Sequence, residues 1–219
     1  MDKKTHIYFM PGLAASSKIF EYINLPDEKF EIHFLNWILP ESVDESLENY
    51  TIRLSRLIKH ENPILVGVSF GGILVQELNK IISVKKTILI SSIKNHHELP
   101  KRLKLLRFTK IYKLFPSKKI SQIEDFSKFG LSHTLKKKSD LYNKYLDVRN
   151  QKYLDWAIYH VLHWKSNDTD QNIIHIHGSA DEIFPVKHIK NSLVIEGGTH
   201  AMIITKAKKI NIILQEIIS

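Results

Sequence analysis

Short aliphatic runs alternate with helical patterns along most of the chain, and this alternation limits the fold more than any other feature. Several of the runs stop at glycine, proline or polar residues, as buried strands do. Parallel strands that are joined by helices are covered on both faces, so the pattern predicts a three-layer α/β/α sandwich with a mostly parallel central sheet. The predicted strands are 5–10, 31–36, 63–67, 86–91, 172–177 and 192–196, and the predicted core helices are 45–59, 70–82 and about 200–217.

The segment 94–165 departs from that alternation and carries the whole basic excess of the chain. It holds 17 Lys and Arg against 6 Asp and Glu, a net charge of +11, whereas the rest holds 15 against 17. Its patterns are helical, over 99–115, over 121–130 and in a run that ends at residues 155–164. We therefore predict a core formed by 1–93 and 166–219, with 94–165 inserted between two core strands as a basic helical cap.

Composition excludes several classes of site. The chain has no cysteine, which rules out disulfides, thiolate metal sites and a cysteine nucleophile. No apolar run is as long as a membrane span, and the apolar run near the N-terminus is short and stops at Pro11-Gly12. We therefore expect a soluble, cytoplasmic protein.

Three loops follow predicted strands and contain most of the glycine in the chain. They are Gly67–Gly71 (GVSFG), His177–Pro185 (HGSADEIFP) and Glu196–His200 (EGGTH). Seven of the eight glycines lie in or beside these loops or at Pro11-Gly12. Because sites in open α/β sheets form beyond the carboxyl ends of the strands, we expect the three loops to surround one site.

Each loop offers one side chain with a chemical role. Glycines two residues either side of Ser69 permit a sharp strand-to-helix turn that exposes its hydroxyl, although an ordinary turn would show the same local pattern. Asp181 could orient a histidine, with Glu182 as an alternative acid, or could only cap a surface turn. His200 could be a general base or an exposed loop histidine.

Together the loops give the chain a clear resemblance to the α/β-hydrolases, whose nucleophile elbow, acid and histidine occur in the order Ser, Asp, His. The resemblance covers residues 5–93 and 166–218, with the basic segment where this family commonly carries a cap. It implies that Ser69 is the nucleophile, Asp181 the orienting acid and His200 the base. The backbone N–H groups of Phe70 and Leu13 would form the oxyanion hole.

The chain departs from the family pattern in two places. Many relatives have His-Gly in the loop after the first strand, where this chain has Pro11-Gly12. The larger relatives also have extra edge strands before that loop, for which this chain has no residues, so we expect a reduced version of the fold.

The resemblance implies a serine hydrolase that cleaves a small or medium carboxylic ester or thioester through an acyl-enzyme, with no cofactor and no metal. An acyltransferase or a lyase on the same fold is the first alternative. The second is a non-catalytic protein that binds an anionic membrane or an acidic partner through the basic cap.

Other features are given structural interpretations. His175-x-His177 lies on a predicted strand without a carboxylate to complete a metal site, so it is interpreted as structural. Trp156, His160 and Trp164 share a helical face and are more typical of a seam between cap and core than of an acyl pocket. The basic helix over 99–115 is interpreted as a cap helix with a solvated face rather than a membrane anchor, and no motif indicates nucleic-acid binding.

Overall fold

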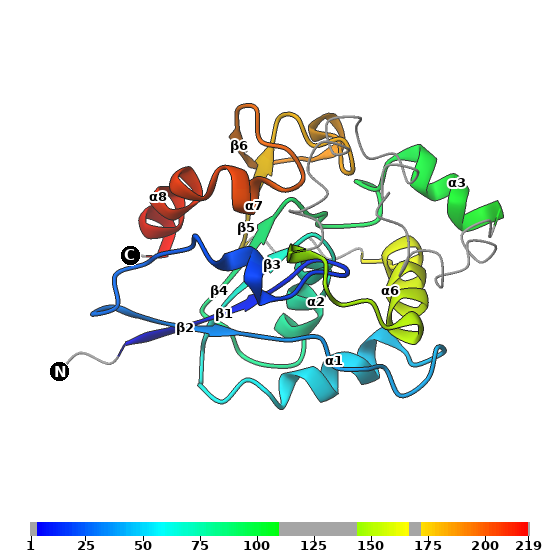
Figure 1. Cartoon of the computed structure of the whole chain (residues 1–219), viewed down its shortest axis with the longest axis horizontal. Helices are drawn as coiled ribbons and strands as arrows, with labels where there is room; N and C mark the ends of the chain where they lie inside the picture. Colours follow the sequence, from blue (N-terminus) through cyan, green and yellow to red (C-terminus); the bar gives the residue numbers. More distant parts are fainter. Residues whose placement is uncertain (1–3, 110–143, 167–171, 219) are drawn as a thin grey trace.

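The computed structural model describes residues 4–109, 144–166 and 172–218. Its centre is a sheet of six strands, all parallel, in the order β2-β1-β3-β4-β5-β6 (Figure 1). The strands are β1 (Thr5–Met10), β2 (Phe30–Phe34), β3 (Ile64–Val68), β4 (Lys86–Ile90), β5 (Ile173–Gly178) and β6 (Leu193–Ile195). The helices are η1 (Ser17–Phe20), α1 (Leu47–Ser55), α2 (Phe70–Asn79), α3 (Lys101–Thr109), α6 (Gln151–His163), η5 (Val186–His188), α7 (Met202–Thr205) and α8 (Ala207–Ile218).

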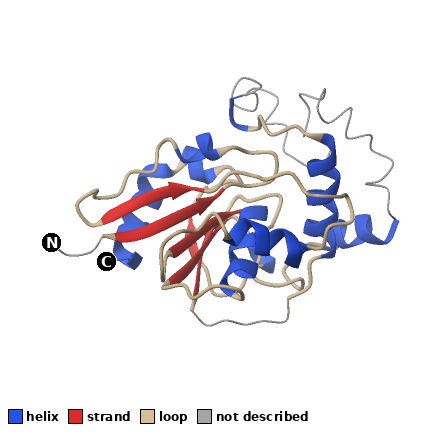
Figure 2. Cartoon of the chain, turned by 90° about the horizontal axis from the view of Figure 1, so that it is seen from below, coloured by secondary structure: helices blue, strands red, loops and turns tan. Residues whose placement is uncertain are grey.

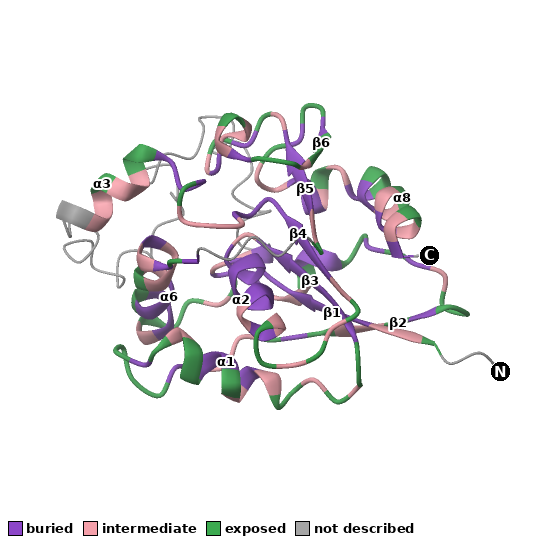
Figure 3. Cartoon of the chain, turned by 180° about the vertical axis from the view of Figure 1, so that it is seen from behind, coloured by how far each residue is buried: buried purple, intermediate pink, exposed green. Residues whose placement is uncertain are grey.

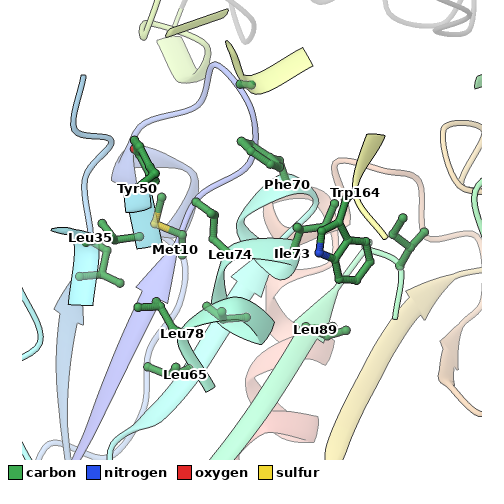
Figure 4. Close-up of a cluster of buried hydrophobic side chains, with 14 of the residues drawn as sticks. Met10, Leu35, Tyr50, Leu65, Phe70, Ile73, Leu74, Leu78, Leu89 and Trp164 are labelled. Carbon is green, nitrogen blue, oxygen red and sulfur yellow. The ribbon is translucent and has the colours of Figure 1, made fainter. Parts of the chain in front are cut away.

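Helices cover both faces of the sheet, which is why the central strands β3 and β4 are apolar on both sides (Figure 2). Alternate residues of β1, β3 and β4 belong to two separate cores. Leu65 and Leu89 face the core that is shared with α1, α2 and α6, part of which is drawn in Figure 4. Val66 and Ile88 face the core shared with η1, α7 and α8. Figure 3 shows the inner strands β1, β3 and β4 buried between these layers, so the predicted α/β/α sandwich is confirmed.

The predicted strands and the first two predicted core helices are present, with shifted ends. The first helix begins at Leu47 rather than at residue 45, because the Ser46 side chain accepts the N–H of Asn49 at 3.1 Å and caps it. The prediction of one helix over 200–217 is wrong. The backbone of Lys206, at φ −124° and ψ 22°, leaves the helical conformation and divides this stretch into α7 and α8.

The basic segment contributes α3 and α6 to the described structure. The helix predicted over 121–130 and the end of the one predicted over 99–115 lie outside the described residues. The division of the chain into core and cap therefore stays a prediction. Arg102 of α3 contacts the carbonyl oxygen of Glu182 and lies 3.3 Å from that of Ile183, which joins this helix to a core loop.

Helix α6 packs against the core along the face that carries Trp156, His160 and Trp164. The indole nitrogen of Trp156 donates to the Glu45 carbonyl at 2.8 Å, and the His160 ring donates to the same oxygen at 3.0 Å. Trp164 donates to the carboxylate of Glu77 on α2 at 2.8 Å. Trp156 is fully buried, so this face of α6 is a packing surface, while its place between a cap and a core stays a prediction.

No helix within the described part of the chain is both long enough and apolar enough to cross a membrane.

Candidate active site

Ser69 stands on the turn between β3 and α2, with a backbone conformation that a serine rarely adopts. Its φ of 52° and ψ of −120° lie outside the common regions, at a cost on the order of 1–3 kcal/mol. Hydrogen bonds hold the turn in place. The Ser69 amide donates to Ile90 O at 3.0 Å, and its carbonyl accepts from the Gly72 amide at 2.9 Å and the Ser92 hydroxyl at 2.7 Å. The sequence prediction of a strand, a sharp turn and a helix is confirmed.

The glycines around Ser69 are required by close approach of the backbone. A Cβ atom at Gly67 would lie 2.4 Å from the carbonyl oxygen of Gly71. One at Gly71 would lie 2.3 Å from the carbonyl oxygen of Met10, at the end of β1. Neither contact could be relieved without moving main chain, so the elbow packs as tightly against its neighbours as the glycine pattern predicted.

Ser69, His200 and Asp181 form one chain of hydrogen bonds. The hydroxyl of Ser69 lies 2.9 Å from Nε2 of His200, and Nδ1 of His200 lies 2.9 Å from Oδ2 of Asp181. An ionised carboxylate only accepts, so Nδ1 carries the proton, and Nε2 is left to accept from the serine. The side chain of Asp181 is fully buried, whereas that of His200 is 25% exposed.

The carboxylate of Asp181 is kept ionised despite its burial. Burial alone would raise the pKa of Asp181, but the charge and hydrogen bond of His200 and the amide of Phe184 outweigh it, so the pKa is lowered. Oδ1 accepts from the amides of Ile183 and Phe184 at 2.8 and 2.9 Å. With both oxygens engaged, Asp181 fixes the ring orientation of His200. Glu182, the alternative acid, does not take this position.

Two neighbouring strands bring the acid and histidine loops together. β5 and β6 are adjacent in the sheet, and the amide of Ala180 donates to Gly198 O at 2.9 Å. Ser179 extends this link, since its hydroxyl donates to the carboxylate of Glu196 at 3.0 Å and accepts from the Gly197 amide at 2.8 Å. The spacing of Asp181 and His200 is thus set by direct contact between their loops.

The buried ring of His177 contacts the loop that carries Asp181. Its Nε2 donates to the Phe184 carbonyl at 2.7 Å and lies 3.6 Å from Oδ2 of Asp181, while Nδ1 lies 3.2 Å from Nε2 of His175. Burial is the first cause that lowers the pKa of His177, and burial likewise lowers the pKa of His175. The two rings are therefore neutral, buried neighbours whose hydrogen bonds serve packing, in agreement with their structural interpretation.

The loop after β1 lies directly against Ser69. A Cβ atom at Gly12 would be 3.2 Å from Cβ of Ser69 and 3.9 Å from its Oγ. Within the described part of the chain, the amides of Leu13 and Phe70 donate to no protein acceptor. Ala14, the next residue, instead donates its N–H to the Tyr153 hydroxyl at 3.3 Å. The two amides predicted for the oxyanion hole thus keep their donor capacity beside the serine.

Side chains from distant parts of the sequence hold this loop in place, and sequence reasoning missed them. The Trp37 indole donates to the carbonyls of Gly12 and Ala15 at 3.2 and 2.9 Å. Tyr153 approaches from α6, and the amide of Val148 donates to the Ala14 carbonyl at 3.0 Å. No local motif marks such contacts, because they join residues from separate elements.

Among the described residues, the group able to hold a metal ion lies away from these loops, at the edge of the sheet. The residues around Ser69 form an arrangement of hydroxyl, imidazole and carboxylate that can transfer a proton from the serine to the histidine. This arrangement supports nucleophilic attack by the serine oxygen.

Comparison of the sequence with protein-family models and with curated proteins finds no match. Solved structures match over nearly the whole chain. The non-heme bromoperoxidase BpoC of Mycobacterium tuberculosis has a TM-score of 0.69 at 11% identity, covering 98% of this chain and 91% of that one. A structure from a study of carboxylesterases of Nitrososphaera gargenis has a TM-score of 0.67 at 15% identity, covering 98% and 90%.

The epoxide hydrolase of Bacillus megaterium also has a TM-score of 0.67, at 14% identity, and the match covers 98% of this chain and 93% of that one. These proteins share the parallel sheet and flanking helices described above, while their sequences differ from this one at most positions. The chain therefore has the α/β-hydrolase fold.

Proposed function

We propose that the protein is a serine hydrolase that cleaves carboxylic esters or thioesters of small to medium size. The observation that carries this proposal is the hydrogen-bonded series Ser69–His200–Asp181, with 2.9 Å at each step, on a strained turn. A serine that only terminated a strand would need neither the strain nor a histidine aligned by a buried carboxylate.

In the proposed reaction Oγ of Ser69 attacks the carbonyl carbon of the substrate while Nε2 of His200 takes the hydroxyl proton. The carbonyl π electrons move to oxygen, and the amides of Leu13 and Phe70 donate to that oxyanion. Collapse of the tetrahedral intermediate expels the alcohol or thiol, which takes the proton from His200, and leaves an acyl ester on Ser69. Water then attacks the ester by the same route and releases the acid.

Asp181 acts on this cycle through His200. Its ionised carboxylate holds Nδ1–H and stabilises the imidazolium that forms when Nε2 is protonated. Because the carboxylate is buried and saturated with donors, it needs no solvent rearrangement as the positive charge develops.

Covalent labelling tests the proposal. A fluorophosphonate probe should label the folded wild type at Ser69, as located by mass spectrometry of peptides, and should not label Ser69→Ala. The variant His188→Ala, which changes a histidine outside the series Ser69–His200–Asp181, should be labelled like the wild type. An unlabelled Ser69 in folded wild-type protein would refute the assignment.

Each alternative function predicts a different experimental result. An acyltransferase would give more ester or amide product than free acid when an alcohol or amine is added. A lyase would cleave its substrate without a probe-sensitive acyl-enzyme. A binding protein that uses the basic segment would sediment with anionic vesicles in a salt-dependent manner, and the probe would not label it.

The acyl preference of the proposed hydrolase can be measured separately. Assays on p-nitrophenyl esters and acyl thioesters of increasing chain length would define it.

A further inference from the structure

The edge of the sheet carries a group of histidines that the proposed hydrolysis does not use. β1 and β2 are parallel neighbours, with His6 opposite Glu31 and Tyr8 opposite His33. Since alternate residues of a strand share a face, these four side chains stand on one face of the outermost strand pair. His60, from the segment between α1 and β3, lies on the same face and stacks on His6 with ring centroids 3.5 Å apart.

The ring nitrogens of the three histidines converge. One nitrogen from each ring lies within 4.8 Å of the other two, and Nδ1 of His6 is 3.1 Å from Nε2 of His33. Ligand nitrogens around a tetrahedral zinc ion are about 3.3 Å apart, given Zn–N bonds of about 2.0–2.1 Å. The nitrogens are thus already near coordination spacing, and rotation of the side chains, which includes tilting the stacked rings of His6 and His60 apart, would aim all three at one ion.

A carboxylate lies beside two of the three histidines. Oε2 of Glu31 lies 3.6 Å from Nδ1 of His6, and Oε1 lies 3.6 Å from Nε2 of His33. The Glu31 side chain is 51% exposed, so it can rotate toward a cation without leaving a buried site. Three imidazoles with one carboxylate make a four-ligand set of the kind that zinc and neighbouring divalent transition metals prefer.

Tyr8 sets the orientation of His60. Its hydroxyl accepts the Lys59 amide at 3.1 Å and lies 2.7 Å from Nδ1 of His60. The Nδ1 atom is thereby engaged, which leaves Nε2 as the atom of His60 that can bind a metal. A hydrogen-bonded partner on the second ring nitrogen is the usual support of a metal-binding histidine.

Two of the three histidines, His33 and His60, also border open space. A pocket of about 540 Å³ is lined by Tyr8, His33, His60 and the apolar residues Trp37, Ile38 and Leu57, among others. A metal ion could therefore enter and keep a water or small ligand.

From this geometry we propose that His6, His33 and His60, together with Glu31, form a binding site for a divalent transition metal of the zinc type. We name these four residues the edge histidine cluster. The bound ion would cross-link three segments at this edge of the sheet: β1, β2 and the segment before β3. The site is separate from Ser69 and independent of the proposed hydrolysis.

Zinc itself is the probe for the first experiment. The purified full chain is titrated with Zn²⁺ in competition with a chromophoric chelator, and we expect one tight equivalent. His33→Ala and His60→Ala should each weaken binding at least tenfold, and Tyr8→Phe should weaken it about tenfold or more. His188→Ala should bind as the wild type does, and so should His200→Ala, which tests whether the triad histidine is the ligand instead.

A spectroscopic readout separates coordination from folding. X-ray absorption at the zinc edge of the loaded protein should show three imidazoles with one or two oxygen ligands, and His33→Asn should lose one imidazole. Far-UV circular dichroism checks that each variant is folded. Absence of a stoichiometric zinc ion in the wild type, or equal zinc affinity in His33→Ala and His188→Ala, would overturn the proposal.

Discussion

The loops around Ser69 and the edge histidine cluster each bring together polar side chains from distant parts of the chain, but they hold their carboxylates differently. Asp181 is fully buried and accepts from two backbone amides as well as from His200. Glu31 is half-exposed and lies 3.6 Å from its nearest histidine nitrogens. One carboxylate is fixed in advance, and the other can still move.

This difference matches the chemistry proposed for each site. Proton transfer between fixed partners benefits from groups that need no rearrangement, so a buried and saturated carboxylate suits the loops around Ser69. A metal ion draws flexible ligands toward itself on binding, so a mobile carboxylate suits the edge histidine cluster. The loops around Ser69 therefore depend on exact backbone placement, whereas the cluster depends on the pairing of two strands.

The largest expected effect is the loss of kcat in Ser69→Ala, which should leave zinc binding unchanged. Ser69→Ala removes the nucleophile and should lower kcat on an ester substrate by about 10⁴–10⁶. The same variant should bind Zn²⁺ with wild-type affinity, because Ser69 takes no part in the edge histidine cluster. Stopped-flow hydrolysis and zinc competition on one preparation check both halves. A loss of zinc binding in folded Ser69→Ala would show that the two sites are coupled.

The second comparison replaces each carboxylate by its amide. Asp181→Asn should lower kcat by about 10³–10⁴, because an asparagine can present its NH₂ group to His200 and disturb the tautomer that accepts the serine proton. Glu31→Gln should change the free energy of unfolding by no more than about 0.5 kcal/mol without metal, because the side chain is half-exposed. Ester hydrolysis and urea unfolding with a chelator present measure these effects. Near-wild-type turnover in Asp181→Asn would contradict the orienting role.

The sequence predicted the loops around Ser69 because their requirements are local. Close backbone approach demands glycine at Gly67 and Gly71, and such demands leave a pattern that can be read in a short stretch. The strand before Ser69 is marked by a continuous aliphatic run, since both of its faces are buried. Local backbone chemistry was therefore enough to place all three side chains at one end of the sheet.

The edge histidine cluster could not be predicted in the same way. His6 and Tyr8, like Glu31 and His33, are two residues apart, a spacing that places side chains on one strand face. The sequence therefore shows which residues of each strand share a face. The sequence does not show the register that sets His6 opposite Glu31, because only the assembled sheet fixes it. Contacts of Trp37 and Tyr153 with the loop after β1 were missed for the same reason.

The dependence of the loops around Ser69 on close backbone approach can be tested with two glycines. In Gly71→Ala the new Cβ would meet the carbonyl oxygens of Met10 and Pro11 at 2.3 and 2.4 Å, so we expect a loss of about 3 kcal/mol in unfolding free energy. Gly197→Ala is the matched control. Its φ is +64°, but the new Cβ would meet only Nζ of Lys206, at an ordinary contact distance of 3.7 Å, so only backbone strain of about 1 kcal/mol is expected. Equal losses in chemical denaturation would show that close approach is not what requires Gly71.

The smallest expected effect is a change in the pH dependence of the unfolding free energy. It compares a histidine near the loops around Ser69 with one in the edge histidine cluster. Burial lowers the pKa of His175, beneath the acid loop, and it also lowers the pKa of His33 in the edge histidine cluster. A lowered histidine pKa means that the unfolded chain binds more protons, so the stability is present above about pH 6.5 and is lost as the pH falls toward the folded-state pKa. Each pKa unit corresponds to about 1.4 kcal/mol.

His175 is buried, with 1% of its surface exposed, whereas His33 is only half-buried, so His175 should account for more of this acid sensitivity. Urea unfolding at pH 7.5 and pH 5.5, with a chelator present, measures the loss for the wild type, for His175→Gln and for His33→Asn. His175→Gln should shrink the difference between the two pH values more than His33→Asn does. If His33→Asn shrank it more, protonation at the edge of the sheet would dominate acid unfolding, and the loops around Ser69 would be the less pH-sensitive of the two regions.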